Sequence, residues 1–330
     1  MARTQYIVPV FIPELACGNK CIFCNQKKIT GINQIPLPEE IREFISNRLS
    51  QLPARAENIE IAFFGGNFTG IDLQLQKEYL AVAQYFIDKN RASSIRISTR
   101  PDSINYQNLE LLNQFAVKTI ELGAQSMCDE VLLLSGRGHT AEDTVIASSM
   151  IKEHGFVLGL QMMTGLPGDT AEKTMNTAKE IIRLDATETR IYPLLVFKNT
   201  SLYDLYLSGE YSPLSLDETI KNLSPVVRLF EESDVKILRL GLHPSDGMNN
   251  GDMVAGPWHP ALRQMIYTHA WNSIIRESLP QNQSLVLRVS TEQFPNALGY
   301  QRKNAGEFPK IQFTADKSIK GMHYEVDYCR

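Results

Sequence analysis

The sequence predicts an α/β fold, a partial (β/α)6 TIM-like barrel followed by a small C-terminal α+β appendage. Two observations predict it: short apolar, β-branched segments recur along the chain, and amphipathic helical patterns lie between them. Such alternation implies parallel strands joined by helical crossovers, and six units of this kind form an open barrel. The expected strands are residues 6–12, 59–64, 95–98, 119–122, 157–163 and 190–196.

The connecting helices are recognised by apolar residues at helical spacing. Ile41, Ile45 and Leu49 form one such stripe, and they follow Glu39 and Glu40. Acidic residues stabilise the first turn of a helix, because they oppose the positive end of its dipole. After the sixth strand, the pattern predicts a helix at 216–232 and a strand at 235–240 that close the side of the barrel.

The last quarter of the chain has a different pattern. Residues 243–260 are rich in Gly, Asn and Pro, which predicts a long loop or lid, with His243 and His259 near its ends. We therefore expect a barrel at 1–245 and a lid with a small appendage at 246–330. The elements expected in the appendage are a helix at 262–278 and strands at 284–289 and 311–313.

Composition limits the class of protein and its partners. The 330 residues are 43% hydrophobic and 21% charged, enough to bury a full-sized core. A formal charge of −4 gives no global basic field for non-specific binding of nucleic acid. The chain has no apolar run of about 18 residues and no apolar N-terminal stretch, so we expect a cytoplasmic protein with no membrane partner.

The most specific motif is a run of three cysteines, ACGNKCIFCNQ, on the loop after the first expected strand. Cys17, Cys21 and Cys24 can wrap one corner of an iron–sulfur cubane, which normally takes four cysteines. Cys128 and Cys329 lie far off in the sequence, so three irons would be ligated and one left open. An open iron can act as a Lewis acid and bind a chelating molecule. The alternative is a zinc knuckle with a distant His or Cys as its fourth ligand.

The cysteine spacing resembles the signature of the radical S-adenosylmethionine (SAM) superfamily, CxxxCxΦC, in which Phe23 is the aromatic residue. The resemblance covers residues 5–245 and implies the same open barrel. It also implies a 4Fe-4S cluster that cleaves SAM reductively to a deoxyadenosyl radical. Five further motifs follow in the family's order: FFGGNFTG (63–70), STRPD (98–102), ELGAQS (121–126), GRGHT (136–140) and MMTGLPGD (162–169).

The resemblance also implies roles for individual residues. Gly65 and Gly66 would meet the amino group of SAM, and their lack of a Cβ permits close approach. Phe23 would lie by the adenine. Arg137 would bind the carboxylate, since a guanidinium fork suits two oxygens. Gln125 and Gln161 would face the ribose. The expected SAM-binding residues are thus Phe23, Gly65, Gly66, Asn67, Arg100, Gln125, Arg137 and Gln161, and the expected cluster ligands are Cys17, Cys21 and Cys24.

Some of these residues also have plain structural interpretations. Arg137 could pair with Glu130 or Asp143 at the surface, and Gln125 could only tie strand ends together. Ser98 departs from the family pattern, which has Glu at this position, so a possible carboxylate partner for the cofactor is missing. The sequence does not identify a catalytic residue.

The motifs resemble most the catalytic subunit of the Elongator complex and, more distantly, oxygen-independent coproporphyrinogen oxidase. The C-terminal residues do not follow the acetyltransferase pattern of the Elongator subunit. We therefore expect a radical enzyme whose substrate is a tRNA base or, as the alternative, a small molecule such as a tetrapyrrole. Its reductant would be an electron donor such as a flavodoxin or ferredoxin. A non-catalytic iron–sulfur or zinc protein, serving as a binding module or sensor, is the alternative from another class.

Overall fold

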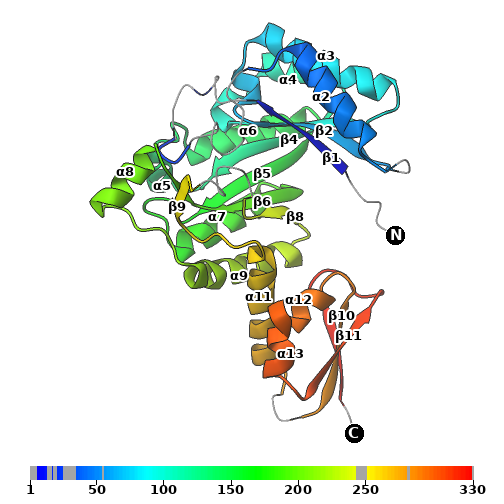
Figure 1. The fold of residues 1–330 in the computed structure, drawn as a ribbon, viewed down its shortest axis with the longest axis vertical. Coiled ribbons are helices and arrows are strands. Elements are labelled where there is room, and N and C mark those ends of the chain that lie inside the picture. The colour runs from blue at the N-terminus through cyan, green and yellow to red at the C-terminus, as the bar shows by residue number, and fades with distance from the viewer. Residues whose placement is uncertain are drawn as a thin grey trace.

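The computed structural model describes residues 6–12, 17, 21–24, 35–53, 56–242, 251–280 and 283–328. Its centre is a seven-stranded parallel sheet with the order β1-β2-β3-β4-β5-β6-β8. The sheet curls into a half-barrel with helices on its outside (Figure 1), which confirms the predicted partial TIM-like barrel and its appendage. β8 takes the edge that the segment 235–240 was expected to occupy.

The parallel strands are β1 (Tyr6–Ile12), β2 (Ile59–Gly65), β3 (Ser94–Thr99), β4 (Val117–Gln125), β5 (Val157–Thr164), β6 (Glu188–Pro193) and β8 (Lys236–Leu240). The crossover helices are α2 (Pro38–Ser50), α3 (Leu73–Asp88), α4 (Tyr106–Asn113), α6 (Ala141–Glu153), α7 (Ala171–Arg183) and α9 (Leu216–Glu232). Shorter elements on the strand-end loops are η1 (Phe68–Gly70), η2 (Pro101–Ser103), α5 (Asp129–Leu134) and α8 (Ser201–Ser208).

Helix starts follow the local sequence. At α9, the Ser215 hydroxyl accepts the backbone N–H of Glu218, and the Glu218 carboxylate accepts the backbone N–H of Ser215 at 2.8 Å. This reciprocal pair satisfies N–H groups that have no partner within the helix. The bounds of α9 therefore coincide with the predicted ones.

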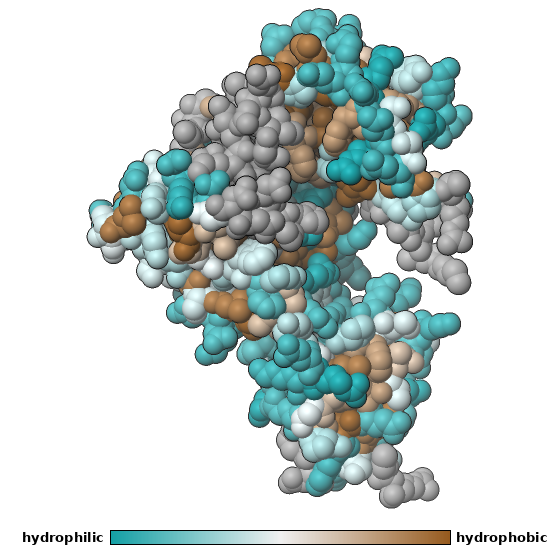
Figure 2. Space-filling view, in the orientation of Figure 1, coloured by the Kyte–Doolittle hydropathy of each residue, from teal (hydrophilic) through white to brown (hydrophobic). Residues whose placement is uncertain are grey.

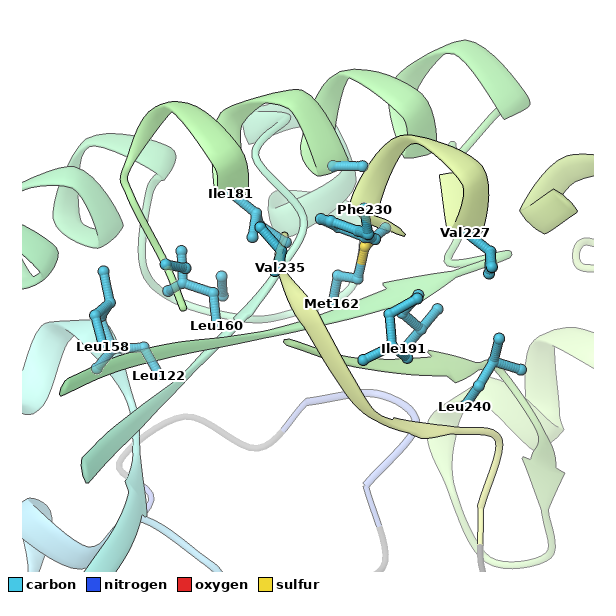
Figure 3. Close-up of a cluster of buried hydrophobic side chains, with 14 of the residues drawn as sticks. Leu122, Leu158, Leu160, Met162, Ile181, Ile191, Val227, Phe230, Val235 and Leu240 are labelled. Atoms are coloured by element: carbon cyan, nitrogen blue, oxygen red, sulfur yellow. The ribbon is translucent and has the colours of Figure 1, made fainter. Parts of the chain in front are cut away.

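The main core lies between the sheet and its helices. Figure 3 shows Leu160 and Met162 of β5 and Ile191 of β6 facing Ile181 of α7 and Phe230 of α9. All five side chains are fully buried. Because side chains alternate along a strand, the residues between these positions face the interior of the half-barrel instead. That interior is where the candidate site lies.

The predicted sixth strand is interrupted. Pro193 ends β6, and the chain resumes as β7 (Val196–Phe197), which leaves the barrel sheet and pairs antiparallel with β9 (Met253–Ala255). β9 lies within the segment predicted as a loop, so that prediction is wrong for these three residues. A short strand flanked by Gly and Pro has no periodicity long enough to be recognised. Residues 243–250, which include His243 and the expected boundary between 245 and 246, lie outside the described residues.

The appendage begins with α11 (Leu262–Ser278), which has the predicted bounds and packs against α9. A three-stranded sheet of order β11-β10-β12 follows, and it lies apart from the barrel sheet in Figure 1. Trp271 of α11 is fully buried and packs edge-to-face on Tyr324, which joins helix and sheet. The elements of the appendage are β10 (Leu285–Ser290), α12 (Phe294–Leu298), η3 (Tyr300–Arg302), α13 (Lys303–Glu307), β11 (Ile311–Asp316) and β12 (Tyr324–Tyr328).

The described surface is mostly hydrophilic on the face in Figure 2, with smaller apolar patches, one of them over α8. None of the described helices combines the length and the apolar character needed to cross a bilayer.

Candidate functional site

The cysteine loop leaves the C-terminal end of β1, and two backbone hydrogen bonds fix its described part. The Ile22 N–H donates to the Ser135 carbonyl after α5 at 3.2 Å, and Ile22 accepts the Leu202 N–H of α8 at 2.9 Å. Ile22 and Phe23 also pack on a small apolar cluster around Val131. The loop is thus attached to elements far along the chain.

The three cysteines line one cavity of about 250 Å³. Cys21 is buried, while Cys17 and Cys24 are partly buried, and none of the three forms a disulfide. Among the described residues, no three His, Cys, Asp or Glu side chains stand close enough together to hold a metal ion. The cysteines therefore share a cavity without forming a compact ligand set. Phe23 of the cysteine loop also lines the cavity, and the rest of the lining comes from β2 to β5 and the loops after them: Gly65, Gly66, Ser98, Thr99, Arg100, Gly123, Gln125, Arg137 and Gln161.

Arg137 reaches this cavity from the loop after α5. Its Nη1 donates to the Cys21 Sγ at 3.2 Å and its Nη2 to the Gly123 carbonyl at 2.5 Å, while Nε has no hydrogen-bond partner among the described residues. The surface pairing considered for Arg137 is wrong, because this side chain is buried. Glu130 pairs with Lys173, and Asp143 caps its own helix at Thr140.

Arg100 follows β3 and faces the same cavity. Asp102 binds its Nε at 2.8 Å and its Nη2 at 2.7 Å, and Nη2 also donates to the Arg137 carbonyl. Burial opposes the charge of Arg100, but the Asp102 carboxylate outweighs it and raises the pKa of the guanidinium. Its Nη1 is buried without a hydrogen-bond partner among the described residues. Arg100 thus brings a fixed positive charge to the cysteines.

Gln125 ends β4 in the left-handed region, with φ of 66°. Such a conformation is costly for a residue other than glycine and is often found at functional sites. The Gln125 Oε1 is buried and has no hydrogen-bond partner within the described part of the chain. This oxygen therefore does not tie strand ends together. A Cβ added at Gly123 would lie 2.9 Å from the Gln125 Nε2, so the glycine leaves room for this side chain.

Gln161 on β5 is held by two hydrogen bonds. Its Nε2 donates to Ser98 Oγ and to Glu121 Oε2, both at 2.8 Å. Glu121 therefore brings a carboxylate next to Ser98, where the family pattern has Glu, although from the neighbouring strand. Burial favours protonation of Glu121, but the positive charge of Arg190 outweighs it and lowers the pKa of the carboxyl.

Asn67 is the one predicted SAM-binding residue that does not line this cavity. Its Oδ1 accepts the Thr99 hydroxyl at 2.6 Å and the Arg100 N–H at 3.2 Å, and its Nδ2 donates to Ser103 at 2.6 Å. These bonds join the loop after β2 to the end of β3, which positions Gly65 and Gly66 relative to Arg100.

His139 was not among the predicted site residues, yet it is buried beside them. Burial, together with the positive charges of Arg137 and Arg100, lowers the pKa of His139 to about 4. The ring is therefore neutral at pH 7. It adds no positive charge to the two arginines.

A second cavity of about 430 Å³ adjoins the first, and the two share Phe23, Cys24, Gly65, Ser98, Gln125 and Gln161 in their linings. Four further aromatic residues and one methionine line it, together with Arg190 and Arg239. Tyr192 of β6 is one of the aromatic residues that line it. These apolar residues are Phe11, Phe64, Met163, Tyr192 and Phe197.

A buried charge network crosses the sheet next to this cavity. Arg96 binds Glu60 at 2.8 Å and Glu121 at 2.7 Å and also pairs with Glu188. Arg190 binds Glu121 at 2.6 Å and lies over the Phe64 ring at 4.8 Å. None of these charge pairs was among the features predicted from the sequence. A signal was available, because charged residues within apolar strands are rare unless they are paired.

Two family models match the chain. Residues 12–181 match the model of the Radical SAM superfamily, and residues 186–271 match the Radical SAM C-terminal domain. The first match alone covers more than half of the chain.

Two curated proteins show what kinds of protein are similar to this chain. The chain is 27% identical to the tRNA uridine(34) acetyltransferase of Methanocaldococcus infernus, over 66% of this chain and 48% of that protein. It is 24% identical to the heme chaperone HemW of Bacillus subtilis, over 58% of this chain and 52% of that protein. The chain thus spans about half the length of these relatives.

A solved structure supports the fold. The archaeal Methanocaldococcus infernus Elp3 superposes with a TM-score of 0.65 at 22% identity, over 85% of this chain and 65% of that chain. At this identity the likeness shows the architecture alone.

Proposed function

Because this chain belongs to the radical SAM superfamily, we propose that it is an enzyme that cleaves SAM reductively and applies the resulting radical to a substrate. The observation that carries the proposal is the 250 Å³ cavity, which three cysteines and the predicted SAM-binding side chains share. Three of those side chains keep buried polar atoms without hydrogen-bond partners among the described residues: Arg100 Nη1, Gln125 Oε1 and Arg137 Nε. Buried polar groups are normally satisfied, so these atoms fit a polar ligand in the cavity.

The proposed cluster ligands are Cys17, Cys21 and Cys24, and thiolates are the ordinary protein ligands of iron–sulfur clusters. When bound, a 4Fe-4S cluster with one open iron supplies the electron that splits SAM into methionine and a deoxyadenosyl radical. Arg137 and Arg100 bring positive charge to the cavity that three thiolates would share.

The remaining proposed contacts follow from which cavity each residue lines. Arg137 suits the carboxylate of SAM, because a guanidinium binds carboxylate oxygens in a fork. Gly65 and Gly66 leave backbone exposed to the cofactor, while Phe23, Gln125 and Gln161 lie at or near the junction of the two cavities. The larger, aromatic cavity is the proposed substrate site. The apolar side chains of its lining would limit the access of water to a radical.

The direct test is SAM cleavage without added substrate. Protein reconstituted anaerobically with iron and sulfide, then given dithionite and SAM, is expected to form deoxyadenosine. Absence of this product from protein with a fully loaded cluster would contradict the proposal and favour a non-catalytic binding protein. In the cell, the reaction requires an electron donor such as a flavodoxin or ferredoxin, and a reducing cytoplasm suits it.

A tRNA base is the proposed substrate, because one relative is named for a modification of tRNA uridine. The second candidate is a tetrapyrrole-like small molecule, which the heme chaperone relative favours. Filter binding of total tRNA over a salt series distinguishes the two candidate substrates. A tRNA substrate predicts that binding weakens steeply as salt rises, since each phosphate contact releases counterions. Binding that is absent at low salt would favour the small molecule.

We predict that Arg137→Ala weakens SAM binding about tenfold to a hundredfold while the cluster stays bound. The reason is that a hydrogen bond to a charged group contributes about 1.5–3 kcal/mol. Equilibrium dialysis with SAM measures the affinity, and iron analysis measures the cluster. Arg183→Ala is the matched control, because Arg183 is an exposed arginine on α7 that pairs with Glu180. Unchanged SAM affinity in Arg137→Ala would remove Arg137 from the site.

A further inference from the structure

A third cavity, of about 390 Å³, adjoins the proposed substrate site on the side away from the cysteines. The two cavities share Pro193, Leu195, Arg239 and Leu242 in their linings, and the third contains none of the cysteines. It lies where the end of β8 meets the residues that lead into α11. None of the predicted site residues lines it.

The charged side chains among the described residues of this lining are both arginines, Arg239 and Arg263. The backbone holds each of them: Arg239 Nε donates to the Gly241 carbonyl at 2.8 Å, and Arg263 Nη1 donates to the Ile237 carbonyl at 3.1 Å. Arg263 Nη2 also donates to the Tyr267 hydroxyl at 3.3 Å. The two guanidinium groups are therefore positioned before any ligand binds.

Positive charge accumulates at this place. Burial lowers the pKa of Arg239, and the nearby charges of Arg190 and Arg263 lower it further, although Tyr192 opposes them. Arg190 lines the proposed substrate site, so the three arginines extend from one cavity into the next. Arg190 already pairs with Glu121, so Arg239 and Arg263 are the guanidinium groups that face the third cavity.

We propose that this third cavity is an anion subsite, which binds a phosphate or carboxylate group of the substrate while the reacting part occupies the adjoining aromatic cavity. The assignment of the reacting part rests on the proposed function, whereas binding of the anion does not. Guanidinium groups bind both kinds of anion through paired N–H donors. His259 adds a further donor: its Nδ1 accepts the Ala261 N–H at 3.0 Å, so a neutral ring carries its hydrogen on Nε2.

The chain offers a natural reporter for this subsite. It has two tryptophans, and Trp258 lines the cavity whereas Trp271 is fully buried in the appendage. We expect inorganic phosphate to change the intrinsic fluorescence saturably at constant ionic strength, with chloride as the reference anion. Trp258→Phe is expected to abolish the change. A parallel titration with acetate distinguishes the sources: phosphate binding indicates a phosphorylated substrate, and preferential acetate binding indicates a carboxylate.

Substitutions of the two arginines test whether the anion binds in the third cavity. Arg239→Gln and Arg263→Gln are each expected to weaken binding about tenfold or more, since each removes a charge-assisted hydrogen bond. Arg239→Lys keeps the charge but not the fork, so an intermediate affinity is expected. Arg183→Gln, on the exposed side of α7, is expected to bind like the wild type. Circular dichroism of each variant checks that it is folded.

Two results would overturn the subsite: no saturable change with either anion, or saturable binding that Arg239→Gln and Arg263→Gln leave unaltered. Neither result bears on SAM cleavage, because deoxyadenosine is measured without substrate. Failure of the subsite and failure of the proposed radical chemistry are therefore distinguishable.

Discussion

We expect the Cys21→Ala variant to contain almost no iron after anaerobic reconstitution, whereas the wild type takes up about four iron atoms per chain, as for one cubane. Cys21 is the most buried of the three cysteines and accepts the Arg137 hydrogen bond. With two thiolates left on the loop, one more iron loses its protein ligand. Iron and sulfide analysis measures the loss, and deoxyadenosine formation is expected to disappear with it.

Cys128→Ala is the matched control and is expected to keep its iron. Cys128 precedes α5 and packs on the same apolar cluster as Phe23, so it lies closer to the cysteine loop than the sequence suggests. It nevertheless lines neither of the two cavities that Cys24 lines. Equal iron loss in both variants would indicate that Cys128 is a fourth ligand, which would leave no open iron for SAM. Zinc in place of iron in the wild type would contradict the cluster itself.

The second large effect concerns folding. We expect Arg96→Met to lower the free energy of unfolding by about 3–5 kcal/mol, because it leaves buried carboxylates without their shared partner. Arg96 is 1% exposed and pairs with Glu60, Glu121 and Glu188. Urea denaturation followed by circular dichroism measures the change. Arg183→Met is the control, and it is expected to unfold at the same urea concentration as the wild type.

The pH dependence of this effect has a definite sign. In the wild type, the pKa of Glu121 is lowered, because Arg190 outweighs the cost of burial. Its contribution to stability is therefore present above the pKa of the unfolded chain, about 4.3, and is lost as the pH falls through the lower folded value. In Arg96→Met, protonation relieves uncompensated negative charge. The stability difference between the two proteins should thus narrow as the pH falls from 7 toward 5, and a constant difference would contradict an electrostatic origin.

Much of the half-barrel could be predicted from the sequence, because its signals are local. The apolar segment at Tyr6–Ile12 and the stripe through Ile41 and Ile45 each lie within one element. The loops that follow the strands could also be predicted to converge, since parallel strands end at the same edge. Cys21, Gly65 and Gln125 follow or end expected strands, so their positions in the sequence predict that they lie at the C-terminal end of the sheet. The structure brings them to one cavity.

Other features depend on contacts between distant segments. Whether Arg137 was exposed or buried could not be decided locally, because Cys21 and Gly123 are its partners. The pairing of β7 with β9 was missed because neither strand exceeds three residues.

The sequence by itself determined the class of protein, since the cysteine spacing and the alternation of strands and helices are written in neighbouring residues. The tertiary structure alone decided which charges meet. Arg96 pairs with Glu188, 92 positions away. Arg239 lines the same cavity as Arg263 because the end of β8 lies next to the start of α11 in space. The physical reason is that electrostatic interactions depend on distance in space and on burial, and strand register and packing fix both.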